Sequence, residues 1–81
     1  MDDLGQLMSK EVLNAKRLLC PLPVIRTQDK VKTMHSGDVL EVVCTDPGVM
    51  QDIPAWCRIN GHKVLDSFSD EMEYTILIEV S

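Results

Sequence analysis

The segment Leu18–Ile25, with the sequence LLCPLPVI, places one cysteine directly before two closely spaced prolines. Proline is favoured at the first position of a helix, because its missing N–H would have no partner there. We therefore predict that a helix begins at Pro21 and that Cys20 occupies the capping position before it. Pro23 falls in the same first turn, where backbone N–H groups are unpaired within the helix. The segment predicts a rigid corner that presents a sulfur atom at a helix N-terminus.

The charge expected around this corner favours a reactive thiol. Thiolate is the reactive form of cysteine, and a helix N-terminus stabilises negative charge. Lys16, Arg17 and Arg26 are close in sequence, and we expect them to help lower the pKa of Cys20. Free cysteines are often small buried apolar residues, but the prolines and the cap position favour Cys20 as a nucleophile and as the holder of a more acidic persulfide.

The segments on either side of the corner alternate between extended and helical patterns. Residues 11–15 predict a short first strand. Apolar residues recur on one helical face from residue 21 to residue 35, and Gly37 occupies the usual position after a helix end. The run DVLEVVCT (residues 38–45) is rich in β-branched residues and too short for a helix, so it predicts a central strand.

The second half of the chain predicts one more helix and a hairpin. Asp46 and Pro47 form a helix-start signal, with the aspartate as the cap, and the helix extends to about residue 59. Pro54 lies inside it, which predicts either a kink or two short helices, the second capped by Asp52. Strands at residues 62–67 and 72–80 complete the chain, and the last one alternates between apolar and polar residues.

The element order βαβαββ predicts an α/β (α+β) fold, a two-layer sandwich with a four-stranded mixed sheet. Right-handed crossovers place both helices on one face of that sheet. The opposite face would then carry Val39, Val43 and Leu77 among polar residues. We predict that this face is available for docking.

The chain has 81 residues, which favours a single domain at residues 10–81 after a flexible lead-in at residues 1–9. Acidic residues occupy the N-terminus, where a signal peptide would carry bases, and no apolar run is long enough to cross a membrane. Three cysteines without paired spacing do not indicate a disulfide framework. We therefore expect a cytoplasmic protein with reduced thiols.

Charge is distributed unevenly along the chain, whose net charge is −5. Residues 10–32 carry six bases against two acids, whereas eight acids lie from residue 41 onward against Arg58 and Lys63 alone. Since Cys20 belongs to the basic part, we expect it on an electropositive side of the molecule. The overall acidity argues against sequence-independent binding of nucleic acid, which requires many phosphate-contacting bases.

The remaining cysteines and histidines give weaker signals. Cys44 lies in an apolar strand pattern and Cys57 on the apolar face of a helix, so core packing is the favoured interpretation of both. A thiol redox protein that pairs Cys20 with either of them stays an alternative. His35 and His62 have no further ligand at metal-binding spacing, so we expect no metal site.

Several short motifs together resemble those of the TusA/SirA family of sulfur carriers. They are Cys20-Pro21-Leu22-Pro23, Asp46-Pro47, Asp52-Ile53-Pro54, Cys57 and Gly61-His62. The resemblance extends from about Leu13 to Ile78. It implies a βαβαββ sandwich like the C-terminal domain of bacterial translation initiation factor three.

The same resemblance implies a sulfurtransferase in which Cys20 accepts sulfane sulfur as a persulfide and passes it to a cysteine of another protein, without a cofactor. Pro21, Leu22 and Pro23 would support the cysteine, and Arg17 and Arg26 would contact partners. The implied donors are cysteine desulfurases or rhodaneses, and the implied acceptors are DsrE-type relay proteins. The sulfur would serve tRNA 2-thiouridine synthesis, molybdenum-cofactor supply or dissimilatory sulfur oxidation, through transient complexes of a monomer.

The chain departs from the family pattern at three positions. Asn14 and Arg17 stand where relatives commonly carry an acidic residue and a glycine. If that glycine serves a turn with positive φ, the loop before Cys20 should differ here. Leu22 replaces a residue that is acidic in some members, which makes a sulfur-oxidation relay at least as compatible as tRNA modification. A rival from another class is a non-covalent regulatory or RNA- or protein-binding module with the same fold.

Overall fold

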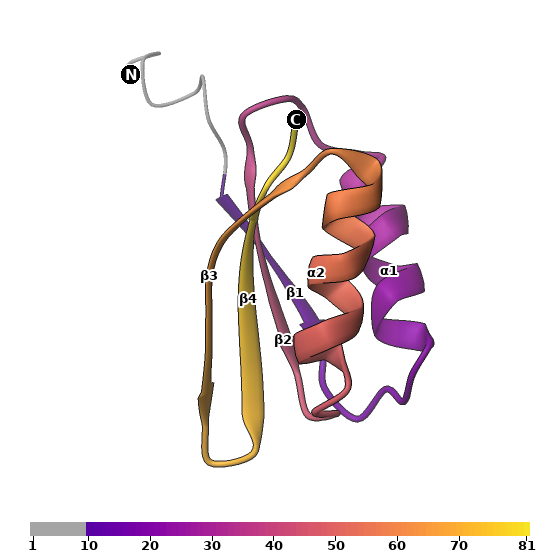
Figure 1. The fold of residues 1–81 in the computed structure, drawn as a ribbon, viewed down its shortest axis with the longest axis vertical. Coiled ribbons are helices and arrows are strands. Elements are labelled where there is room, and N and C mark those ends of the chain that lie inside the picture. The colour runs from indigo at the N-terminus through magenta and orange to yellow at the C-terminus, as the bar shows by residue number, and fades with distance from the viewer. Residues whose placement is uncertain (1–9) are drawn as a thin grey trace.

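A computed structural model describes residues 10–81 (Figure 1); the predicted lead-in at residues 1–9 lies outside the described residues. The elements follow the predicted order βαβαββ. They are β1 (Lys10–Ala15), α1 (Leu22–Val31), β2 (Val39–Cys44), α2 (Val49–Asn60), β3 (Lys63–Asp70) and β4 (Glu73–Glu79). The four strands form one mixed sheet in the order β1-β2-β4-β3, and the predicted fold class is confirmed.

Both helices cover the same face of the sheet (Figure 1). β1 pairs in parallel with β2, β2 pairs antiparallel with β4, and β3 joins the other edge of β4. Each parallel strand is followed by a helix that returns along the sheet, so β1 and β2 end where α1 and α2 begin. The loops after these two strands are therefore neighbours in space.

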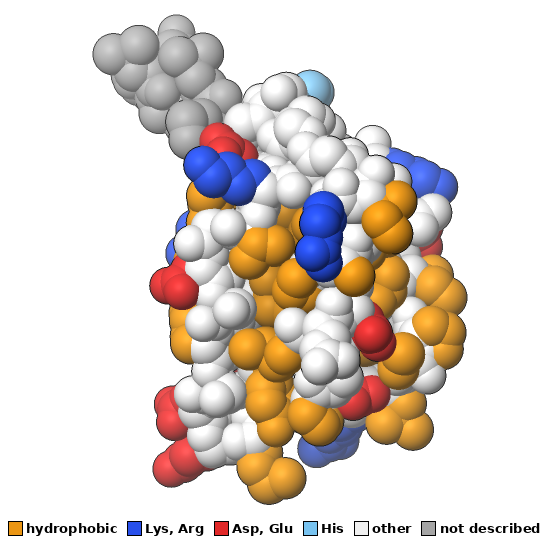
Figure 2. All heavy atoms as spheres, in the orientation of Figure 1, with side chains coloured by type: hydrophobic (Ala, Val, Ile, Leu, Met, Phe, Trp, Pro, Cys, Tyr) orange, Lys and Arg blue, Asp and Glu red, His pale blue; other side chains and the backbone are white. Residues whose placement is uncertain are grey.

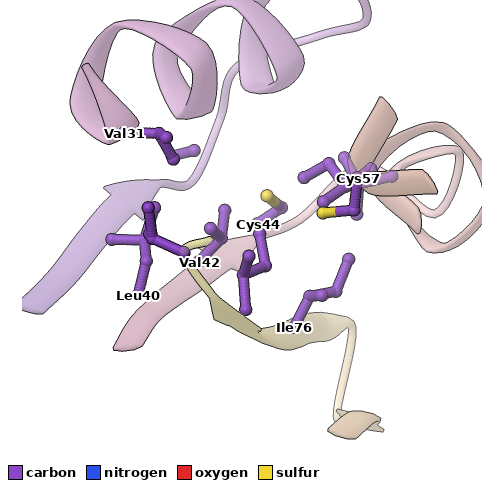
Figure 3. Packing of buried hydrophobic residues seen from close by; sticks show 11 residues of the cluster. Val31, Leu40, Val42, Cys44, Cys57 and Ile76 are labelled. Atoms are coloured by element: carbon purple, nitrogen blue, oxygen red, sulfur yellow. The ribbon is translucent and has the colours of Figure 1, made fainter. Parts of the chain in front are cut away.

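The core lies between the sheet and the helices (Figure 3). Alternate residues of β2 and β4 point toward the helices, so that Leu40 and Val42 pair with Ile78 and Ile76 in register. All four side chains are fully buried, as is Ile53 from α2. Removing such aliphatic side chains from water is the main favourable term in folding.

Both helices are shorter than predicted. α1 ends at Val31 instead of His35, because the following N–H groups bond carbonyls three residues back, as in a turn: that of Thr33 to Lys30 and that of Met34 to Val31. α2 begins at Val49, two residues later than predicted, and Gly48 is its cap.

Pro54 lies inside α2, which nevertheless runs as one helix over Val49–Asn60. The alternative of two short helices, the second capped by Asp52, is therefore wrong. Asp52 instead lies in the first turn of α2, where the helix dipole favours an acidic side chain. No helix within residues 10–81 combines the length and the apolar character needed to cross a membrane.

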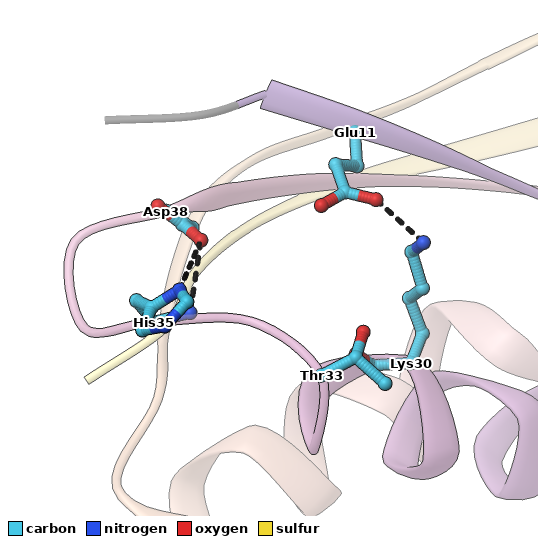
Figure 4. A network of polar contacts seen from close by, with 5 residues as sticks. All are labelled: Glu11, Lys30, Thr33, His35 and Asp38. Atoms are coloured by element: carbon cyan, nitrogen blue, oxygen red, sulfur yellow. Dashed lines mark hydrogen bonds and ion pairs between the residues drawn. The ribbon is translucent and has the colours of Figure 1, made fainter. Parts of the chain in front are cut away.

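Polar contacts fix the end of the sheet opposite the two helix starts (Figure 4). Glu11 of β1 forms an ion pair with Lys30 in the last turn of α1. The Asp38 carboxylate, which is 5% exposed, accepts the backbone N–H of His35 over 2.8 Å. These contacts fasten α1 to β1 and hold the connection into β2.

The hairpin of β3 and β4 is longer than predicted on its first strand, which extends to Asp70 instead of Ser67. Its two-residue turn consists of Glu71 and Met72, with φ of 48° and 69°. Such values at both central residues are typical of a type I′ turn, which is usually built from Asn-Gly. The sequence does not indicate this turn, because neither residue is a turn former, and the prediction places Met72 in the last strand.

The sheet face away from the helices carries apolar side chains, as predicted. Val39, Val43 and Leu77 are partly buried there. In the alternating register, Val12 and Phe68 belong to the same face, and they are 60% and 48% exposed. The docking role of this face stays a prediction.

Candidate functional site

The corner that contains Cys20 lies at the end of the molecule where β1 and β2 finish and both helices begin (Figure 1). Two loops meet there, residues 16–21 after β1 and residues 45–48 after β2. Figure 2 shows acidic, basic and hydrophobic side chains reaching the surface at this lower end. The site combines charges of both signs with exposed apolar groups.

Two backbone hydrogen bonds tie the cysteine loop to the second loop. The N–H of Arg17 donates to Oγ1 of Thr45 over 2.9 Å, and the N–H of Cys20 donates to Oδ2 of Asp46 over 2.9 Å. Oδ1 of Asp46 accepts the N–H of Gly48 at the same distance. One carboxylate thus joins the cysteine to the start of α2.

These hydrogen bonds also act on the ionisation of Asp46. The N–H groups of Gly48 and then of Cys20 lower the pKa of the Asp46 carboxyl, because both stabilise its charged form. The prediction of Asp46 as the cap of α2 is wrong, because Gly48 is the cap and Asp46 accepts its N–H from two residues before it. The hydrogen bond between Asp46 and Cys20 depends on the parallel pairing of β1 with β2. Local sequence therefore does not predict this hydrogen bond.

The loop keeps a backbone conformation that glycine adopts easily, although its residue is arginine. Arg17 has a φ of 68°. This value lies in the left-handed region, which residues other than Gly, Asn and Asp rarely adopt. The glycine expected of relatives at this position would relieve that strain. The loop therefore makes the positive-φ turn without the glycine.

The thiol of Cys20 donates a hydrogen bond to Oδ2 of Asp52, with 3.0 Å between the sulfur and the oxygen. This bond raises the pKa of Cys20, and the charges of Asp52 and Asp46 raise it further. The sequence-based prediction of a lowered pKa is therefore wrong. The nearest charged partner of the sulfur is a carboxylate from α2, and neither Arg17 nor Arg26 is among the groups that act on it.

The helix start also differs by one residue from the prediction. Pro21 is the cap of α1, Leu22 is its first residue and Pro23 follows in the first turn. The N–H of Leu22 donates to the carbonyl of Leu19 over 2.8 Å, so it is not directed at the sulfur. The Cys20–Pro21 peptide bond is cis. The corner is present as predicted, but the helix N-terminus does not supply the hydrogen bond to sulfur.

The side chains around Cys20 divide into exposed and buried ones. Cys20, Arg17 and Arg26 are exposed, and Leu19 and Leu22 are 72% and 44% exposed. Pro23 is fully buried and fixes the start of α1 against the core. The sulfur is thus accessible beside an apolar rim formed by Leu19 and Leu22.

Cys44 and Cys57 are buried, at 0% and 1% exposure, and Figure 3 shows both in the core between β2 and α2. Burial raises the pKa of each thiol to about 11. All three cysteines are free. The interpretation of Cys44 and Cys57 as core residues is confirmed.

A surface hollow of about 380 Å³ lies beside α2 and the start of β3. Its lining consists of Pro54, Cys57, Arg58, His62, Lys63 and Val64. None of these residues belongs to the corner around Cys20. Within residues 10–81, no three His, Cys, Asp or Glu side chains are grouped so that they could hold a metal ion.

Comparison with known proteins assigns the chain to a family. The family model for sulfurtransferase TusA matches residues 11–80. The sulfur carrier protein TusA of Allochromatium vinosum is 36% identical over 69 residues, which cover 85% of this chain and 91% of that protein. A Neisseria meningitidis serogroup A protein, provisionally named a sulfur carrier, is 38% identical over 72 residues, or 89% of this chain and 97% of its own.

A solved structure has the same fold. The SirA-like protein from Desulfitobacterium hafniense superposes with a TM-score of 0.78 over 88% of this chain and 97% of its own. Its sequence identity is 19%, so this likeness supports the fold alone. The sequence matches carry the family assignment.

Proposed function

The chain belongs to the TusA sulfurtransferase family, and we propose that it carries sulfane sulfur as a persulfide on Cys20. The observation that carries this proposal is the accessibility of the cysteines. Cys20 is exposed on a corner, whereas Cys44 and Cys57 are buried with their pKa raised to about 11. A carrier needs one sulfur that partner proteins reach, and only Cys20 meets that requirement.

Loading is a thiol exchange that requires no cofactor. The Cys20 thiolate attacks the outer sulfur of a donor persulfide, a bond forms between the two sulfurs, and the S–S bond of the donor breaks. The donor cysteine leaves as a thiolate. Transfer repeats the step in the other direction, when an acceptor thiolate attacks the outer sulfur on Cys20. Sulfur is passed on with no net oxidation or reduction.

Specificity must come from docking of proteins, because Cys20 lies exposed on a corner of the surface. Leu19 and Leu22 offer exposed apolar contacts beside the sulfur, and Arg17 and Arg26 are exposed on the same corner. These complexes should be short-lived, because a carrier has to release each partner. We propose a cysteine desulfurase or rhodanese as donor and a DsrE-type relay protein as acceptor, bound in turn by a monomer.

Leu22, the apolar residue after Pro21, is relevant to which sulfur pathway the protein serves. Leu22 places an aliphatic side chain, 44% exposed, beside the sulfur, where an acidic residue would favour a basic partner surface. We propose a relay for dissimilatory sulfur oxidation, with tRNA 2-thiouridine synthesis as the second destination. Three free thiols support a reducing compartment such as the cytoplasm.

Loading with inorganic polysulfide, followed by intact-mass measurement, tests the proposal. The wild type should gain the mass of sulfur, and peptide mapping should place it on the peptide that contains Cys20. Cys20→Ser should gain none under the same conditions, although Cys44 and Cys57 are still present. Equal gain in the variant, or no gain in either protein, would refute the proposal.

A further inference from the structure

The chemistry of a sulfur carrier does not by itself explain why Asp52 contacts the sulfur of Cys20. Its Oδ2 lies 3.0 Å from the sulfur of Cys20 and accepts the thiol proton. A carboxylate accepts hydrogen bonds and has no proton to give. The contact therefore exists only while Cys20 is a thiol, since a thiolate there would face a like charge. The arrangement stabilises the unreactive form of the nucleophile.

Asp52 is held in this position by α2. Its own N–H donates to the carbonyl of Gly48 over 3.0 Å in the first helical turn. The ion pairs that lysines form with carboxylates among the described residues join Lys10 to Glu41, Lys16 to Glu73 and Lys30 to Glu11. Within residues 10–81, Asp52 forms no ion pair with any lysine or arginine.

The charged groups nearest the thiol come from two elements packed against it. Asp52 lies on α2 and Asp46 in the loop before α2, and both raise the pKa of Cys20. Asp46 uses both oxygens for the N–H groups of Cys20 and Gly48, so it acts as a fixed anchor. Arg17 and Arg26 are exposed on the cysteine loop and α1 without acting on the thiol. Asp52 is therefore the carboxylate that a partner is able to engage.

We propose that Asp52 keeps Cys20 protonated between encounters, and that a lysine or arginine of the docking partner frees the thiol by pairing with the Asp52 carboxylate. This inference rests on the proposed function of Cys20. Pairing withdraws the acceptor from the thiol and brings a positive charge close to it, so the proton passes to solvent and a thiolate is left. That thiolate then attacks the outer sulfur of the donor persulfide as described above.

The groups around Cys20 indicate which chemical groups a partner surface needs. It carries a cation close to its own persulfide cysteine, to meet Asp52, and an apolar rim to cover Leu19 and Leu22, which are 72% and 44% exposed. Oppositely charged groups that meet in a largely apolar contact interact more strongly than in water. An unloaded carrier away from such a surface stays a thiol and reacts slowly with other electrophiles.

Two synthetic donor peptides test the inference. Each carries one cysteine persulfide, flanked by arginines in the first peptide and by glutamates in the second. The rate of sulfur loading on Cys20 is measured at neutral pH for the wild type, Asp52→Asn and Asp66→Asn. Asp66 is exposed on β3 and does not act on the thiol, so its variant changes the net charge equally and is the matched control.

The wild type and Asp66→Asn should accept sulfur several-fold faster from the arginine peptide than from the glutamate peptide, because a cation on Asp52 increases the thiolate fraction of Cys20. Asp52→Asn should lose most of that preference and accept sulfur from the glutamate peptide faster than the wild type. Equal preference in Asp52→Asn and Asp66→Asn would overturn the inference.

Two further readouts separate the possible failures. If no protein gains sulfur on Cys20 from either peptide, the proposed function itself fails. The pH dependence of Cys20 alkylation by iodoacetamide, located by peptide mapping, requires no sulfur chemistry and gives the thiol pKa directly. That pKa should fall in Asp52→Asn and stay unchanged in Asp66→Asn; an unchanged pKa in Asp52→Asn would overturn the inference even if loading occurs. Circular dichroism verifies that each variant is folded.

Discussion

The backbone N–H of Cys20 donates a hydrogen bond to the Asp46 carboxylate over 2.9 Å, across 26 residues of sequence. The same carboxylate accepts the N–H of Gly48. The loop after β1 is thus fastened to the loop after β2 at the residue that presents the sulfur. This relationship explains why the cysteine is exposed and yet held in place.

Replacing Asp46 should weaken the fold, and in a way that depends on pH. Its pKa is lowered from an ordinary value of 3.8, so its stabilising contribution is present above that pH and is lost as the pH falls through the lower folded value. Asp46→Asn should lower Tm at neutral pH and should lower it much less once the pH has fallen through the folded pKa, which lies below 3.8. Thermal unfolding of both proteins across this range is the measurement, and a Tm difference that does not shrink in acid would contradict the account.

Unmodified Cys20 should react slowly with alkylating reagents at neutral pH. Hydrogen bonding to Asp52 raises its pKa above the ordinary 9.0, so the thiolate fraction near pH 7 is smaller than in an unstructured cysteine peptide. The rate of iodoacetamide modification at Cys20 should be several-fold below that of such a peptide at neutral pH, and the two should converge at high pH. A faster reaction than the peptide at neutral pH would restore the lowered pKa predicted from sequence.

Alkaline conditions should destabilise the protein through its buried thiols. Cys44 and Cys57 have pKa values raised to about 11 in the folded protein, against an ordinary 9.0. A raised folded value means that the contribution is complete below pH 9 and is lost as the pH rises toward 11. Urea unfolding should show a free energy that falls through this interval. A free energy that stays constant there would argue against burial of both thiols.

Arg17 gives a test of the strained loop. Glycine has no side chain, so it adopts this left-handed conformation without the steric cost. It also increases the entropy of the unfolded chain, which opposes part of the gain. Arg17→Gly should therefore be more stable than Arg17→Ala by about 1 kcal/mol, because alanine keeps the same φ of 68°. Chemical denaturation of the two variants measures the difference, and equal stability would show that the turn is not strained.

The sequence predicted the fold well because its elements carry strong local signals. The prolines after Cys20 indicate a helix start, and a helix begins there. The β-branched run of residues 38–45 indicates a central strand, and it forms β2. The site was predicted only in part. Cys20 was found from its prolines, whereas its contact with Asp52 depends on how α2 packs beside the cysteine loop. Local charge counting suggested nearby bases instead, because spacing along the chain does not report which side chains meet.

The turn between β3 and β4 is a second feature that the local sequence does not predict. Glu71 and Met72 both adopt positive φ, and nothing in their chemistry favours a turn. Pairing of β3 with β4 imposes the conformation. After a register shift between Val64 and Asp66, the pairing runs from Asp66 opposite Leu77 to Asp70 opposite Glu73. Tertiary pairing overrides a weak local preference here.

Discharge of a loaded carrier tests the central claim most directly. The wild type is loaded with polysulfide, separated from excess reagent, and mixed with a peptide that contains one free cysteine. We predict that its intact mass returns to that of the unloaded protein while the peptide gains one sulfur atom. Sulfur that stays on the protein, or that leaves without appearing on the peptide, would contradict a role for Cys20 as a carrier.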